Sequence, residues 1–125
     1  MADVRDQLRE FALSLPDTSE DFPWGECVVK VRGKVFVFLG HDDDSGPPGM
    51  TVKLVESHGH ALALKGARPS GYGLGRAGWV NVPLYAEGVT RDLLRDWIEE
   101  SYRIIAPKRL VAELDRRPSA DRVRG

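Results

Sequence analysis

The sequence predicts an α+β protein in which helices pack on one antiparallel sheet. Two runs rich in Val and Phe flank Arg32-Gly33 within residues 27–39, which is the pattern of a β-hairpin with a tight turn. Apolar residues near both ends of the chain recur at helical spacing. Because hairpin-linked strands are segregated from the long helices, an antiparallel layer is favoured over a parallel doubly wound sheet.

Length and composition indicate a single soluble domain. The chain has 125 residues, 42% of them hydrophobic and 30% charged, with a formal net charge of -1. No apolar run approaches the about 18 residues that span a membrane, and the first ten residues lack the apolar core of a secretory signal. The single cysteine, Cys27, is expected to be a small buried hydrophobe. We therefore expect a cytoplasmic monomer.

The first element is an amphipathic helix over about residues 3–14. Its apolar positions follow one helical face and are Val4, Leu8, Phe11, Ala12 and Leu15. Asp3 is the expected N-cap, and Pro16 ends the helix. Residues 16–25 are predicted to form a loop in which Phe22 and Trp24 cover one edge of the core.

The hairpin at residues 27–39 sets the two faces of the predicted sheet. A two-residue loop places Val29 opposite Phe36 and Cys27 opposite Phe38, which makes one fully apolar face for the helices. The other face then carries Val28, Lys30, Val35, Val37 and Leu39. That second face is either another buried layer or a surface kept for a ligand.

The middle of the chain supplies the remaining strands and a short helix. Residues 41–49 form an exposed polar turn, and residues 50–55 alternate as a third strand with Lys53 away from the core. Ser57 is expected to cap a helix over residues 58–65 that packs through Ala61, Leu62 and Leu64. The glycine-rich residues 66–78 leave room for a short strand at 72–74, and residues 79–84 alternate as another strand that ends at Pro83 or lies at the sheet edge.

The C-terminal helix has the clearest signals. Thr90 is a good N-cap, and the apolar period continues from Leu94 until Pro107 interrupts it. Pro107 is expected at the first position of a final short helix. The polar residues 115–125 are predicted to be a disordered tail, so that residues 1–114 form the folded domain.

Several short segments together resemble the YjbR/MmcQ family. They are Leu15-Pro16, Phe22-Pro23-Trp24-Gly25, Val31-Arg32-Gly33-Lys34-Val35-Phe36, Gly78-Trp79-Val80-Asn81-Val82 and Glu100-Ser101-Tyr102. The resemblance covers about residues 4–114 and rests on their order and spacing. It implies a two-layer sandwich of an antiparallel five-stranded sheet with helices on one face, in the order α-β-β-β-α-β-β-α, similar to secretion-chaperone-like folds. Members of the family are commonly labelled DNA-binding, by analogy of fold.

No catalytic or cofactor-binding constellation is evident. His58 and His60 with Asp42, Asp43 and Asp44 could supply imidazole and carboxylate ligands to a metal, but no further ligand follows at fixed spacing. Cys27 lies in a strand and Ser101 in a helix, where neither is a typical nucleophile. The glycines of residues 71–75 lack phosphate-loop spacing and lead into a strand. We expect a protein that is not an enzyme and carries no cofactor or metal.

A local charge asymmetry is the strongest functional signal. Residues 65–84 contain no Asp or Glu, and Lys30 and Lys53 are expected to project from the sheet face that also carries Trp79 and Asn81. Basic residues interleaved with aromatic residues suit phosphate contacts and base stacking. The candidate nucleic-acid-binding residues are Lys30, Lys53, Lys65, Arg68, Arg76 and Trp79. The other interpretation is that the lysines only solvate an open sheet and that Trp79 fills a hydrophobic corner.

Two functions stay open on this evidence. The first is weak, non-specific binding of DNA by the uncovered sheet face and the loop that follows Lys65. The second is binding of a small aromatic ligand or a protein partner on the same face, over a shallow apolar floor of Val28, Val35, Val37 and Leu39. The two differ in salt dependence, because phosphate contacts weaken steeply with salt and apolar burial does not.

Overall fold

The protein folds as an α+β sandwich with an antiparallel sheet on one side and helices on the other. The computed structural model describes residues 4–41, 49–71 and 74–117. The strands are β1 (Thr18–Asp21), β2 (Glu26–Val31), β3 (Lys34–His41), β4 (Gly49–Lys53), β5 (Arg68–Pro69) and β6 (Trp79–Pro83). The helices are α1 (Val4–Leu13), α2 (His58–Leu62), α3 (Arg91–Ile105) and α4 (Lys108–Asp115), with 3-10 turns η1 (Pro23–Gly25) and η2 (Leu74–Ala77).

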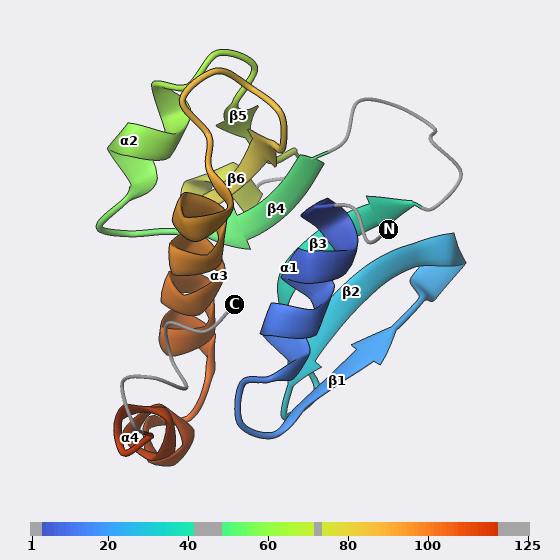
Figure 1. The fold of residues 1–125 in the computed structure, drawn as a ribbon, viewed down its shortest axis with the longest axis vertical. Coiled ribbons are helices and arrows are strands. Elements are labelled where there is room, and N and C mark those ends of the chain that lie inside the picture. Colours follow the sequence, from blue (N-terminus) through green and yellow to red (C-terminus); the bar gives the residue numbers. More distant parts are fainter. Residues whose placement is uncertain (1–3, 42–48, 72–73, 118–125) are drawn as a thin grey trace.

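The sheet has the order β1-β2-β3-β4-β6-β5, and every neighbouring pair is antiparallel. In Figure 1, α1 and α3 lie in front of the strands, and α4 lies beyond the end of α3. Each α helix contributes buried side chains to one core, among them Leu8, Ala61, Leu94 and Leu110. The predicted fold class is therefore confirmed, with six strands in the described part of the chain where five were predicted.

The additional strand is β1, which the sequence analysis assigned to a loop. Its sequence is Thr-Ser-Glu-Asp, which has little intrinsic preference for strand. It nevertheless pairs with β2 along its whole length. Arg9 of α1 donates to both carboxylate oxygens of Glu20, at 2.5 and 2.7 Å. These hydrogen bonds lower the pKa of Glu20. Phe22, which follows β1, is 48% exposed, so the prediction that it covers the core edge is wrong.

The short strand predicted at residues 72–74 is also misplaced. Residues 72 and 73 lie outside the described part of the chain, and Leu74 begins η2. The strand is β5 instead, two residues long, in which Arg68 pairs with Asn81 and Pro69 with Val80. Pro83 ends β6 beyond this short edge, as expected of a residue that cannot donate a ladder hydrogen bond.

The hairpin turn is confirmed, but its register is not the predicted one. Arg32 and Gly33 both have positive φ, 52° and 82°, as the tight hairpin turn requires, and Val31 pairs with Lys34. Farther from the turn, Val29 pairs with Val37, not with Phe36, and Cys27 pairs with Gly40. The register shifts twice because β3 holds an extra residue at each of two β-bulges.

The two bulges exchange residues between the faces of the sheet. Val37 and Leu39, predicted on the uncovered face, belong to the core under the helices. Phe38, predicted in that core, pairs with Val28 and lies on the other face. The alternation predicted for β4 and β6 is confirmed, since Val52 and Val80 are fully buried core residues. Thus the sequence pattern gave the correct faces wherever the strand was regular.

The other helix ends show small corrections. Thr90 caps α3 as predicted, because its hydroxyl accepts from the Leu93 N–H. Ser57 occupies the N-cap position of α2, but its side chain makes no capping bond, and α2 ends at Leu62, short of the predicted residue 65. Pro107 is the N-cap of α4 and not its first residue. Helix α4 runs to Asp115, which is the first residue of the predicted tail. Within that tail, residues 118–125 lie outside the described part of the chain.

Three consecutive residues of α3 attach this helix to three other segments. The Glu100 carboxylate accepts from the backbone N–H groups of Val55 (2.8 Å) and Ser57 (3.2 Å) and from the Ser57 hydroxyl (2.7 Å). Burial acts to raise the pKa of Glu100, but these hydrogen bonds outweigh it and the pKa is lowered. The segment before α2 is therefore fixed by hydrogen bonds to Glu100, and not by a capping bond from the Ser57 side chain.

Ser101 fastens α3 to the sheet at the bulge in β3. Its Oγ donates to the carbonyl of Phe36 at 2.6 Å and accepts from the N–H of Lys53 at 3.0 Å. The register that pairs Val37 with Val52 would place Phe36 beside Lys53 on the next strand. The hydroxyl therefore bridges a backbone group of β3 and one of β4, and Ser101 is fully buried in doing so.

Tyr102 completes the attachment and makes stability sensitive to alkaline pH. It is fully buried, its hydroxyl donates to the carbonyl of Pro16 at 2.7 Å, and burial raises its pKa to about 12. The tyrosine of the unfolded chain ionises near pH 10, whereas Tyr102 in the folded protein stays protonated to about pH 12. The stability that this difference in pKa gives is complete below about pH 10 and is lost as pH rises toward 12, at about 1.4 kcal/mol per pH unit.

We expect Tyr102→Phe to remove that part of the alkaline slope. Urea unfolding at pH 9, 10 and 11 measures the free energy of unfolding directly. Tyr85→Phe is the matched control, because Tyr85 is 62% exposed. The interpretation fails if the Tyr102→Phe slope between pH 10 and 11 parallels that of the unchanged protein.

Candidate nucleic-acid interface

The face of the sheet opposite the core, called the open face below, is defined by cross-strand register. Residues paired across neighbouring strands point to the same side of a sheet. One row across the open face is Arg68, Asn81, Thr51, Phe38, Val28 and Asp21. Beside it, Lys53 pairs with Trp79 and Lys30 with Val35. Val28 and Trp79 are the two buried hydrophobic residues that lie outside the core cluster, in the described part of the chain.

An aromatic pair lies across β4 on the open face. The rings of Phe38 and Trp79 meet edge to face, with centroids 5.5 Å apart and planes at 71°. Trp79 is only 9% exposed, whereas Phe38 is half-buried. Trp79 therefore fills a hydrophobic corner, the second of the two predicted interpretations, and its ring is not the stacking platform that was predicted. Phe38 is the ring that solvent reaches.

A polar pair occupies the centre of the same face. Thr51 on β4 and Asn81 on β6 are cross-strand partners, and the Thr51 hydroxyl donates to Asn81 Oδ1 at 2.7 Å. This bond uses the amide oxygen of Asn81 and leaves its Nδ2 amino group as a donor. Both side chains are half-buried. Neither Phe38 nor Thr51 was among the predicted site residues, and the bulges in β3 explain why Phe38 was missed.

The two ends of the open face differ in charge. At the β1 end, Lys30 pairs with Asp21 at 2.9 Å. The Lys30 hydrogen bond, together with the Phe22 N–H, lowers the pKa of Asp21. At the other end, β4, β5 and β6 contain no acidic residue and carry Lys53 and Arg68. The cationic part of the face is therefore the β4-β6-β5 part, and Lys30 is largely neutralised.

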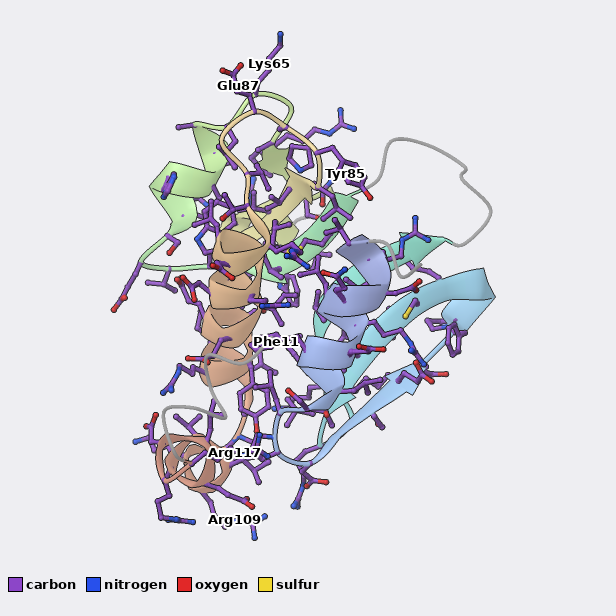
Figure 2. All side chains as sticks on the ribbon, viewed as in Figure 1. Phe11, Lys65, Tyr85, Glu87, Arg109 and Arg117 are labelled. Atoms are coloured by element: carbon purple, nitrogen blue, oxygen red, sulfur yellow. The ribbon has the colours of Figure 1, made fainter. Side chains whose placement is uncertain are left out.

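The remaining predicted cations lie around that cationic end. Arg68 is exposed on β5, Arg76 is exposed in η2, and Lys65 is exposed in the segment after α2. Figure 2 shows Lys65 with Glu87 at the extreme end of the molecule, far from Arg109 on α4. The structure thus brings Lys53 and Arg68 onto one face, places Arg76 in the 3-10 turn next to β6, and leaves Lys65 at the extreme end of the molecule.

The apolar floor predicted for a small ligand is reduced by the bulges. Val37 and Leu39 are in the core, and Val28 is fully buried. Of the four predicted residues, only Val35 has partly accessible surface on the open face. A shallow apolar groove built from Val28, Val35, Val37 and Leu39 is therefore not what this face presents.

The histidines do not form a metal site with other described residues. The His60 ring packs edge to face on Trp97, with centroids 5.3 Å apart, and His58 begins α2. Within residues 4–41, 49–71 and 74–117, no group of three or more His, Cys, Asp or Glu side chains could hold a metal ion. The three aspartates that follow His41 lie outside the described residues. None of the helices described is both long and apolar enough to cross a bilayer.

A family model described as YjbR matches residues 13–104, which is well over half of the chain. No curated protein matches the sequence significantly. The matched range ends just after Glu100, Ser101 and Tyr102, which attach α3 to the loop before α2, to the sheet and to the end of α1. This part of the resemblance therefore reports how the fold is held together, and the function has to be argued from the open face.

Proposed function

Because the chain belongs to the YjbR family, whose pattern here specifies the fold, we propose a function from the surface that this fold leaves uncovered. The protein is a non-enzymatic DNA-binding protein that contacts phosphates with the cationic end of the open face. The observation that carries this proposal is the grouping of Lys53 and Arg68 with the Thr51–Asn81 pair on strands that contain no acid.

The chemistry of the face supports binding and requires no reaction. Its polar groups are an amide, a hydroxyl and two cationic side chains, which bind phosphate oxygens and base edges by hydrogen bonds and ion pairs. With Lys30 paired to Asp21, few phosphates are contacted. We therefore expect weak, non-specific binding, with a Kd of about 10⁻⁴ to 10⁻⁶ M at physiological salt.

Reversing two charges on the open face should abolish this binding. We expect Lys53→Glu with Arg68→Glu to weaken DNA affinity by at least about 100-fold at low salt. The slope of log K against log salt should also fall by about 2, since each phosphate contact contributes about 0.9. Fluorescence anisotropy with a labelled mixed-sequence oligonucleotide measures both quantities, and thermal unfolding shows that each variant is folded.

The control carries the same charge change elsewhere on the surface. Lys108→Glu with Arg109→Glu alters two exposed residues of α4, at the end of the molecule away from β5 (Figure 2). Exposed substitutions of this kind usually change stability by less than about 0.5 kcal/mol. The proposal is wrong if the unchanged protein does not bind at low salt, or if the α4 reversal weakens binding as much as the open-face reversal.

A further inference from the structure

We infer that the DNA ligand of the open face is a single strand, laid across β3, β4, β6 and β5 with one base stacked on Phe38. This inference rests on the proposed function and narrows it to one form of DNA. Three features support it: the shape of the face, the position of Phe38, and the donor left open on Asn81.

Among the described residues, the open face offers no helix to enter the major groove of a duplex. Base edges in B-DNA are read by an α-helix or a β-ribbon that enters the major groove. In the described part of the chain, all four α helices send side chains into the core on the opposite side of the sheet. A sheet that presents an aromatic ring can receive a single strand whose bases are unstacked, as four-stranded RNA-binding modules do when they stack two or three bases.

Phe38 is positioned to stack on a base. The bulges in β3 turn it onto the open face, where it is half-buried, and the edge-to-face contact with Trp79 holds the ring in place. A ring that is already ordered loses little side-chain entropy on binding. Stacking on an aromatic ring requires an unpaired base, and any of the four bases can provide the π-face.

Polar and cationic groups lie in the same row and in the next one. Phe38 and Asn81 both pair with Thr51, on its two sides, so one residue of β4 separates them. The Asn81 amino group can donate to a base carbonyl or ring nitrogen, because its oxygen is occupied by Thr51. Arg68 lies beyond Asn81 at the sheet edge, and Lys53 lies beside Trp79. A DNA strand that crosses this row meets the Phe38 ring, the Asn81 donor and Arg68 in succession, with Lys53 in the neighbouring row.

The test compares one labelled 20-nucleotide DNA strand, designed without self-complementarity, with its duplex. We expect the single strand to bind at least about tenfold more tightly at low salt. Phe38→Leu, which keeps an apolar side chain against Trp79, should weaken single-strand binding about 5-fold to 150-fold, the range for loss of one stacked base. Phe22→Leu is the matched control, since Phe22 is an exposed ring that follows β1 at the other end of the sheet.

The outcomes separate this inference from the proposed function. Duplex binding that is as tight as single-strand binding overturns the inference and leaves DNA binding intact. Binding of neither form overturns both. An RNA strand of the same sequence that binds more tightly than DNA overturns the choice of DNA. If Phe38→Leu binds as the unchanged protein does, or if Phe22→Leu loses as much affinity, the base is not stacked on Phe38.

Discussion

Replacing Ser101 with alanine is expected to lower the free energy of unfolding by about 2 to 4 kcal/mol. The Ser101 hydroxyl donates to the Phe36 carbonyl of β3 and accepts from the Lys53 N–H of β4. Alanine lacks the hydroxyl, so the Phe36 carbonyl and the Lys53 N–H both lose this hydrogen-bond partner. Each unsatisfied buried group costs about 1 to 3 kcal/mol. Ser101 is fully buried, so water cannot readily replace the hydrogen bonds that alanine removes.

Chemical denaturation measures the change, and Ser14→Ala is the control. Ser14 is an exposed serine whose hydroxyl also donates to a backbone carbonyl, that of Phe11, where water can replace it. We expect the control to lose less than about 1 kcal/mol. A loss below 1 kcal/mol for Ser101→Ala would mean that the sheet closes at the bulge without the hydroxyl.

Gly78→Ala is expected to destabilise the protein by about 3 kcal/mol or more. Gly78 has a φ of +98°, and a Cβ at this position would lie 2.7 Å from the carbonyl oxygen of Leu54. The Gly78 carbonyl also accepts from the Leu54 N–H at 2.9 Å, so the two backbones cannot separate without losing that bond. The cost combines an unfavourable backbone conformation, about 1 to 3 kcal/mol, with a displaced hydrogen bond.

Gly88→Ala separates the two parts of that cost. Gly88 has a similar positive φ of +85°, but a Cβ there would meet no atom within 4 Å. Urea unfolding of both variants gives the conformational cost from Gly88 and the additional cost of the close contact from the difference. If the two variants lose the same stability, the approach of Gly78 to Leu54 contributes nothing.

The helices and the regular strands could be predicted because each carries a periodic signal. Helices α1 and α3 end close to the prolines that were expected to end them, and β4 and β6 alternate between core and open face as predicted. Strand β1 could not be recognised in this way. Its residues are polar, and it is held by the ion pairs of Arg9 with Glu20 and of Lys30 with Asp21, which the composition of the segment itself does not reveal.

The faces of β3 could not be predicted from its composition. Val35, Phe36, Val37, Phe38 and Leu39 are all apolar, so alternation carries no information there, and each β-bulge transfers the following residues to the opposite face. This single feature explains both errors about the site. It removed Val37 and Leu39 from the predicted apolar floor and added Phe38 to the open face. Arg68 was identified because the acid-free segment of residues 65–84 is visible in the sequence, and Lys53 was placed on the open face by the regular alternation of β4.

The junction between β3 and β4 also bears on how the chain is completed during synthesis. Among the described residues, these two strands are joined by the register pairs Val37–Val52 and Phe38–Thr51, and Ser101 of α3 bridges the Phe36 carbonyl and the Lys53 N–H beside them. A ribosome delivers the whole sheet before it delivers that serine. The strands of the sheet therefore leave the exit tunnel before Ser101 can bridge β3 and β4. Until α3 has been made, the emerging chain can be bound by chaperones or can misfold.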